Sequence, residues 1–132
     1  MKGPKGELKR KMVSTYVKVA VEGNAVVLSA KEGTKREKTA LNTLAAHLRN
    51  MVKGVQQPWV YKLKVCSSHF PMNVSVSGKD FIVKNLFGEK VPRTMKLKEG
   101  VTVKVAVQDI TVESCNLELA GSTAGDIEQL TR

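Results

Sequence analysis

The sequence has few of the residues from which metal and redox sites are built. It contains 2 histidines and 2 cysteines among 132 residues, and aromatic residues make up 5%. The cysteines, Cys66 and Cys115, do not form a CxxC pair, so we expect reduced, unreactive thiols rather than a disulfide. His47 has no second ligand at metal-binding spacing, so a surface position is expected. The sequence therefore predicts neither a metal nor a cofactor.

Catalytic constellations are also missing. Ser67, Ser68 and His69 followed by Asp80 invite comparison with a hydrolase triad, but no Gly-x-Ser-x-Gly elbow surrounds either serine. No paired carboxylates lie in an apolar run that would separate their pKa values. The sequence predicts that the protein is not an enzyme.

Long hydrophobic runs are absent as well. No apolar stretch approaches the roughly 18 residues needed to cross a bilayer, and the N-terminal residues lack the apolar core of a signal peptide. We therefore expect a soluble, cytoplasmic protein with no membrane partner.

What the sequence does contain is a repeat. The string Val-Lys-Val-Ala-Val occurs at residues 17–21 and again at 103–107. Its period of two places the three valines on one face of a strand. Each copy follows a Gly-Glu segment and precedes a second apolar strand and a region typical of a helix. This order indicates two copies of one module.

The repeat predicts an α+β fold of two tandem, internally duplicated modules, each a mainly antiparallel sheet packed against one helix. We place the modules at residues 1–56 and 57–132, because Gln56-Gln57-Pro58 interrupts the helical period. Hairpins are expected at residues 16–30 and 73–85, around glycine-containing turns, and a strand at 59–70.

Helices are expected at residues 34–55 and 123–132. The first is the clearest element, because Leu41, Leu44, Leu48 and Val52 recur at steps of three and four residues. We expect these four side chains to be buried against the first sheet.

Positive charge is abundant and unevenly distributed. Lysine and arginine number 22 against 12 acidic residues, which gives a net charge of +10 and favours a polyanionic partner. Residues 1–55 hold 12 basic and 4 acidic side chains, residues 56–98 hold 8 and 2, and residues 99–132 hold 2 and 6. Basic side chains on strands and turns, with a few aromatics, are typical of an RNA-binding surface. The competing class is a basic β-scaffold for protein–protein interaction, which would not copurify with RNA.

Several stretches resemble the large-subunit ribosomal protein six family, in its archaeal and eukaryotic branch. They are Lys-Gly-Pro-Lys-Gly-Glu-Leu at 2–8, Arg-Asn-Met-Val-Lys-Gly-Val at 49–55, Tyr-Lys at 61–62, His-Phe-Pro-Met-Asn-Val at 69–74 and Asn-Leu-Phe-Gly-Glu-Lys at 85–90. They follow the family's order and spacing over essentially the whole chain. Against the family's usual pattern, we expect the sequence to lack a strand before Lys2 and a basic tail after the second helix.

The resemblance implies a structural constituent of the large ribosomal subunit that binds large-subunit ribosomal RNA near the sarcin-ricin loop. Neighbouring ribosomal proteins and nearby translational GTPases are the other implied partners. It also implies that residues 57–132 form the main RNA-binding domain. Charge and matched position together give these candidate RNA-binding residues: Lys62, Lys64, His69, Lys84, Asn85, Phe87, Gly88, Lys90, Arg93 and Lys96. For Phe87, stacking on a base and burial in the core both remain open.

Overall fold

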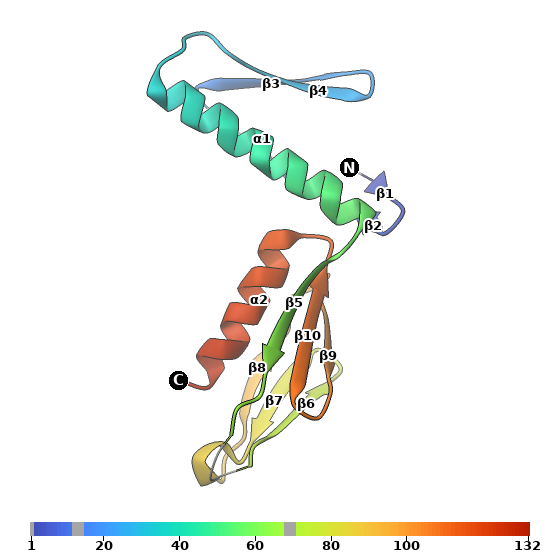
Figure 1. Cartoon of the computed structure of the whole chain (residues 1–132), viewed down its shortest axis with the longest axis vertical. Helices are drawn as coiled ribbons and strands as arrows, with labels where there is room; N and C mark the ends of the chain where they lie inside the picture. The colour runs from blue at the N-terminus through green and yellow to red at the C-terminus, as the bar shows by residue number, and fades with distance from the viewer. Residues whose placement is uncertain (1, 12–14, 68–70) are drawn as a thin grey trace. The chain divides into compact units, whose positions relative to one another are not determined.

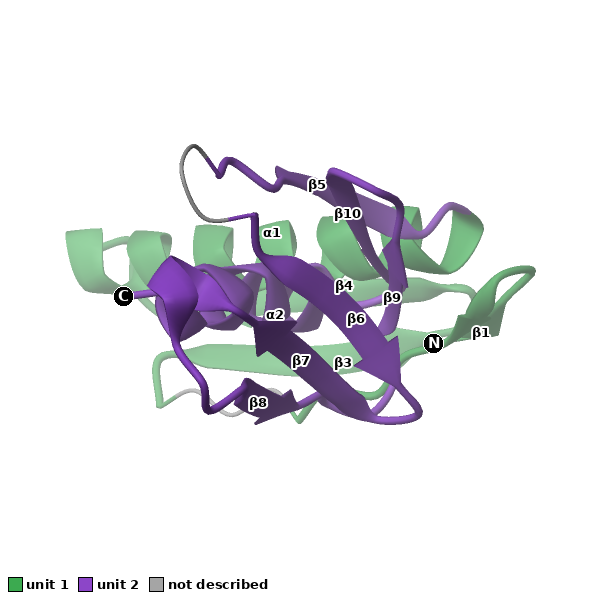
Figure 2. Ribbon diagram, turned by 90° about the horizontal axis from the view of Figure 1, so that it is seen from below, with its two compact units in different colours: residues 1–56 green, residues 57–132 purple. Residues whose placement is uncertain are grey.

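The computed structural model describes residues 2–11, 15–67 and 71–132 and divides into two compact units, residues 1–56 and 57–132 (Figures 1 and 2). Each unit combines antiparallel strands with one α-helix. The predicted α+β class, with a repeated sheet-and-helix module, is confirmed.

Unit 1 is a thin module. Its elements are β1 (Lys2–Gly3), β2 (Gly6–Glu7), β3 (Val17–Glu22), β4 (Ala25–Ala30) and α1 (Lys35–Gln56). The strands β3 and β4 pair along their full length, with Val17 opposite Ala30 and Glu22 opposite Ala25. Gly23 supplies the positive φ, 57°, that this tight turn requires.

The face of α1 is less covered than its pattern predicts. Leu41, Leu44 and Leu48 are only partly buried, and Val52 is 41% exposed, so the prediction that Val52 is buried is wrong. A helix of 22 residues is about 33 Å long, whereas strands of 6 residues extend only about 20 Å. Two short strands therefore cannot cover the helix from end to end.

The C-terminal end of α1 is covered instead by the β1–β2 hairpin. The Lys5 amide donates to the Val55 carbonyl at 3.0 Å, and Val55 is 4% exposed. A Cβ at Gly3 would lie 2.6 Å from Val55 Cβ, so only glycine fits there.

Unit 2 has two three-stranded sheets. Its elements are β5 (Trp59–Lys64), β6 (Asn73–Ser77), β7 (Asp80–Lys84), the 3₁₀ turn η1 (Leu86–Gly88), β8 (Arg93–Lys96), β9 (Thr102–Val105), β10 (Asp109–Ser114) and α2 (Leu117–Leu130). The strand orders are β5-β10-β9 and β6-β7-β8, antiparallel throughout. The strand β5 ends at Lys64, short of the predicted end at 70; residues 68–70 lie outside the described residues.

The core of unit 2 lies between the two sheets and α2, which contacts β5, β8 and β10. Alternate residues of β7 and β10 point into it, as the period of a strand requires. Its buried apolar members are Phe81, Val83, Leu86, Ile110, Val112, Ala124 and Ile127.

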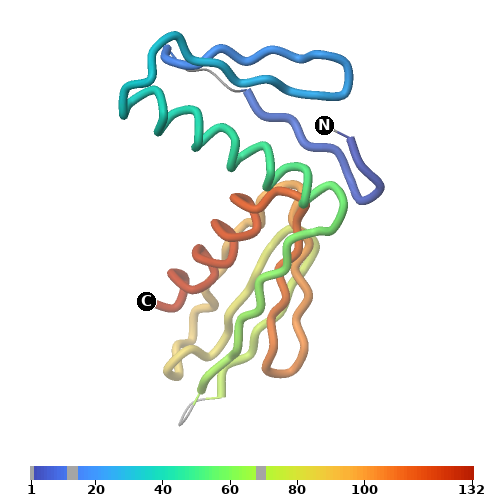
Figure 3. The backbone as a smooth tube through the Cα atoms, turned by 45° about the horizontal axis from the view of Figure 1, so that its top comes forward, coloured from blue at the N-terminus to red at the C-terminus, as the bar shows by residue number. Residues whose placement is uncertain are grey.

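The two repeat strings occupy equivalent places. The first lies in β3, which pairs with β4 before α1, and residues 103–105 of the second lie in β9, which pairs with β10 before α2 (Figure 3). The second helix, however, begins at Leu117 rather than at the predicted residue 123. Asn116 caps it by accepting from the Glu118 amide at 3.0 Å.

Candidate nucleic-acid interface

Two candidate lysines lie on one face of the β5-β10-β9 sheet. Lys62 and Lys64 are exposed and alternate with the partly buried Leu63, so both point away from the core. Neither has an ion pair within the described ranges. In β10, Lys62 is opposite Thr111, and Lys64 is opposite Asp109.

The same sheet adds a lysine that the sequence did not single out. Thr111 is paired on its other side with Lys104 of β9, so Lys62, Thr111 and Lys104 form one row across the sheet. Lys104 is exposed. It was missed because it belongs to the acidic C-terminal segment, although its place in the repeated string, between two valines, marks it as facing outward.

The second sheet carries two further candidates. Lys84 of β7 is opposite Asn73 of β6, and Lys96 of β8 is opposite Asp80 of β7. Both lysines are exposed and alternate with inward-facing Val83 and Met95. The candidate lysines of the strands therefore project from two different sheets of unit 2.

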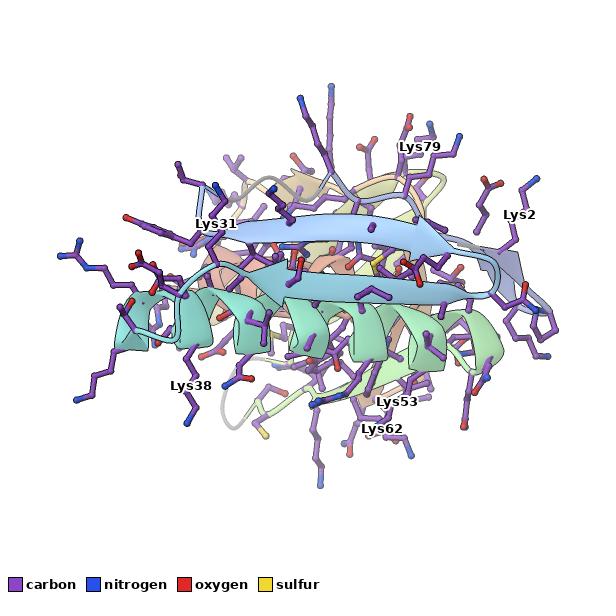
Figure 4. All side chains as sticks on the ribbon, turned by 90° about the horizontal axis from the view of Figure 1, so that it is seen from above. Lys2, Lys31, Lys38, Lys53, Lys62 and Lys79 are labelled. Atoms are coloured by element: carbon purple, nitrogen blue, oxygen red, sulfur yellow. The ribbon has the colours of Figure 1, made fainter. Side chains whose placement is uncertain are left out.

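Two other lysines of this unit form ion pairs with carboxylates. Lys79 lies 3.4 Å from Glu99, and Lys98 lies 3.0 Å from Asp126. The candidate lysines on the strands, by contrast, have no ion pair within the described ranges. In unit 1, Lys38 extends from the first turns of α1 into solvent (Figure 4).

The turn after β7 has an unusual backbone. Asn85 (φ 61°) and Phe87 (φ 50°) are the only non-glycine residues with positive φ in the described part of the chain, and Gly88 follows at 76°. The Asn85 side chain donates through Nδ2 to the Pro71 carbonyl at 3.1 Å. Leu86 is buried, whereas Phe87 is 75% exposed. Of the two readings left open for Phe87, burial in the core is therefore excluded.

All three guanidinium nitrogens of Arg93 donate hydrogen bonds within the protein. Its Nη2 and Nε donate to the two carboxylate oxygens of Glu89, at 2.7 and 3.0 Å. Its Nη1 donates to the carbonyl of Leu130, the last residue of α2, at 2.9 Å and to that of Arg132 at 3.0 Å. We refer to these contacts as the Arg93 clamp.

The clamp also shifts the pKa values of Glu89 and Arg93. The hydrogen bond from Arg93 lowers the pKa of Glu89 against the opposing effect of burial, and the same bond raises the pKa of Arg93. Cations near the last carbonyls of a helix are favourable because the helix dipole is negative there. The geometry thus gives Arg93 a structural role, in which it joins Glu89 to the end of α2, and its contact with RNA stays a prediction.

The remaining two candidates are His69 and Lys90. His69 lies outside the described residues. Lys90 is exposed, immediately after Glu89, with no ion pair in the described regions. The residues that the structure describes contain no cluster of three or more metal-ligating side chains and no helix long and apolar enough to cross a membrane.

Comparison with known proteins gives one consistent result. The family model described as Ribosomal protein L6 matches residues 1–58 and 70–132. The chain is 44% identical to large ribosomal subunit protein uL6 of Nanoarchaeum equitans, over 98% of this chain and 71% of that protein. It is 42% identical to the uL6 of Ignicoccus hospitalis and 38% identical to that of Natronomonas pharaonis, in each case over 100% of this chain and over 74% and 75% of those proteins.

Proposed function

The chain belongs to the ribosomal protein L6 family, and we propose that it binds large-subunit ribosomal RNA mainly through unit 2. As a member of this family it is a structural protein of the large ribosomal subunit, with ribosomal RNA and ribosomal proteins as its partners, and not an enzyme. The proposed position is near the sarcin-ricin loop, where translational GTPases dock. That position rests on the resemblance of the motifs in residues 61–90.

The observation that carries the proposal is a set of exposed lysines fixed on the strands and turn of unit 2. Those lysines are Lys62, Lys64, Lys84, Lys90 and Lys96, and none has an ion pair within the described ranges. Four of them stand on hydrogen-bonded strands, so no further backbone entropy is lost when they meet phosphates. Each phosphate that they neutralise releases counterions, which makes the affinity depend on salt.

Two triple variants with equal loss of charge test the choice of unit. Lys62, Lys64 and Lys90 are changed to glutamine in one, and Lys31, Lys35 and Lys38 in the other. The affinity falls with salt, and removal of one lysine–phosphate contact reduces the magnitude of the logarithmic salt slope by roughly 0.7 to 0.9. The first variant should therefore reduce that magnitude by about two. The second variant should change the slope little, because its three lysines are exposed to solvent where the hairpin joins α1 and do not belong to the strands and turn of unit 2. Lys31 precedes α1 in a bend, and Lys35 and Lys38 lie in its first turn.

Both variants are titrated with a large-subunit RNA fragment that contains the sarcin-ricin loop, across a series of salt concentrations. Equal slopes for the two variants would overturn the assignment to unit 2. Hydroxyl-radical footprinting of the same complex tests the position, because protection that excludes the neighbourhood of the loop contradicts it. If the purified protein carries no nuclease-sensitive RNA even at low salt, the protein-scaffold alternative gains support.

A further inference from the structure

Phe87 is an exposed aromatic side chain on a strained backbone. A positive φ is uncommon for a bulky residue, and the cost is ordinarily balanced by packing of the side chain. Phe87, at φ 50° and 75% exposed, gains little from packing in the free protein. Sparsely populated backbone conformations of this kind cluster at functional sites.

The turn that carries Phe87 is firmly anchored on both sides. Leu86 is inserted into the core at 6% exposure, and the Glu89 amide donates back to the Leu86 carbonyl at 2.9 Å. On the far side, the Arg93 clamp joins Glu89 to the C-terminal end of α2. The Phe87 ring is therefore presented on a fixed support, which lowers the entropy cost of binding through it.

The charges around the ring favour a polyanion. Lys84 and Lys90 flank the turn and are exposed without an ion pair in the described part of the chain. Glu89, the one carboxylate between them, has both oxygens on Arg93. An apolar ring in positive surroundings matches a nucleobase, which has a flat face for stacking and a phosphate on each side.

From this geometry we propose that Phe87 is a stacking platform for one unpaired base of the ribosomal RNA, and that the Arg93 clamp positions it. The inference rests on the proposed function and adds to it a class of ligand, an unstacked nucleotide in a loop or bulge. Lys84 and Lys90 bind the neighbouring phosphates, and Phe87 supplies affinity that does not depend on salt. Arg93 is a positioning residue, because its Nε, Nη1 and Nη2 donate to Glu89 and to the carbonyls at the end of α2.

The test uses the whole chain carrying Phe87→Ala, Phe87→Leu or Phe87→Trp, titrated with the same ribosomal RNA fragment at one salt concentration and then across a series. Loss of one base–aromatic stack should weaken binding by roughly 5- to 150-fold in Phe87→Ala while the salt slope stays unchanged. Phe87→Leu should behave like Phe87→Ala, because leucine is apolar without an aromatic face, and Phe87→Trp should keep the affinity. Val91→Ala is the matched control, since Val91 is 76% exposed near the same turn and should be silent.

A second readout identifies the base and tests the clamp. 2-Aminopurine placed at unpaired positions of the RNA should show one site quenched by the wild type and not by Phe87→Ala. Arg93→Gln should lower that quenching, and Arg93→Lys should restore little of it, because lysine lacks the fork that reaches Glu89 and the α2 carbonyls together.

The outcomes separate the two claims. No salt-dependent binding by the wild type means that the proposed function has failed. Salt-dependent binding with equal affinity in Phe87→Ala overturns the stacking inference alone, and so does wild-type affinity in Phe87→Leu. If Phe87→Ala binds RNA normally but enters ribosomal subunits poorly, the stacking inference is also overturned, and the ring contacts a neighbouring protein instead of a base.

Discussion

Two phenylalanines six positions apart in the sequence should lose very different amounts of stability on the same substitution. Phe81 of β7 is fully buried, at 0% exposure, in the core of unit 2, whereas Phe87 is 75% exposed in the turn. Phe81→Ala should lower the free energy of unfolding by about 3 to 5 kcal/mol, through reduced burial and the cavity left behind. Full burial of a large apolar side chain contributes about 1.5 to 3 kcal/mol, so Phe87→Ala should cost under about 1 kcal/mol.

Phe87→Gly sharpens the contrast, because glycine adopts positive φ without steric cost. Relief of the backbone strain then opposes the small loss of packing and the entropy of glycine. We expect the stability of this variant to stay within about 1 kcal/mol of the wild type. RNA binding should nevertheless fall as in Phe87→Ala.

Urea unfolding measures these differences. The protein has one tryptophan, Trp59, which lies in β5, so its fluorescence reports on unit 2. Midpoints are compared at constant m-value, which scales with the surface exposed on unfolding. If Phe81→Ala leaves no folded unit 2 at all, Phe81→Leu provides a milder step in the same direction. A midpoint lowered more by Phe87→Ala than by Phe81→Ala would refute the packing on which both arguments depend.

Two further predictions concern the anchors of each unit. Gly3→Ala should destabilise unit 1 by about 1 to 3 kcal/mol, because the new Cβ would lie 2.7 Å from the Val55 carbonyl oxygen as well as close to its side chain. Faster hydrogen exchange at the Lys5 amide, with no such change in Gly33→Ala, where nothing lies within 4 Å of the added Cβ, would support this. Glu89→Gln should remove a pH-dependent part of stability: the lowered pKa of Glu89 stabilises the fold above the ordinary value of 4.5, and this stabilisation is lost as pH falls below 4.5 through the folded-state value. An acid titration of Trp59 fluorescence that is identical in wild type and Glu89→Gln would contradict it.

Local patterns in the sequence predicted most of the strands and the first helix. Alternating apolar residues on each side of Gly23 and Gly78 predicted the two hairpins, and both glycines have the positive φ that such turns require, 57° and 58°. The helix predicted at residues 34–55 runs from Lys35 to Gln56. These features depend on neighbours in the sequence, which is why the sequence reveals them.

The second helix shows where local patterns fail. Gly121, Ser122 and Gly125 are poor helix formers, so the first turns of α2 look like a loop. The helix forms there because Ala120 and Ala124, at 0% and 6% exposure, are buried in unit 2. At Gly121 a Cβ would lie 3.2 Å from the Tyr61 hydroxyl oxygen, so close packing against β5 replaces helix propensity.

The residues of the candidate site depend on contacts that are distant in the sequence. Arg93 resembles its basic neighbours in the sequence, yet its bonds to Leu130 and Arg132 cross 37 and 39 positions. Lys104 shows the reverse case. It belongs to the acidic segment of the sequence, but in the sheet it shares a row with Lys62. Charge along the chain can therefore predict that a polyanion is bound, but only strand register can say which cations face it. An electrostatic surface on a β-sheet is built across strands, because residues opposite one another in register lie closer than residues two apart in one strand.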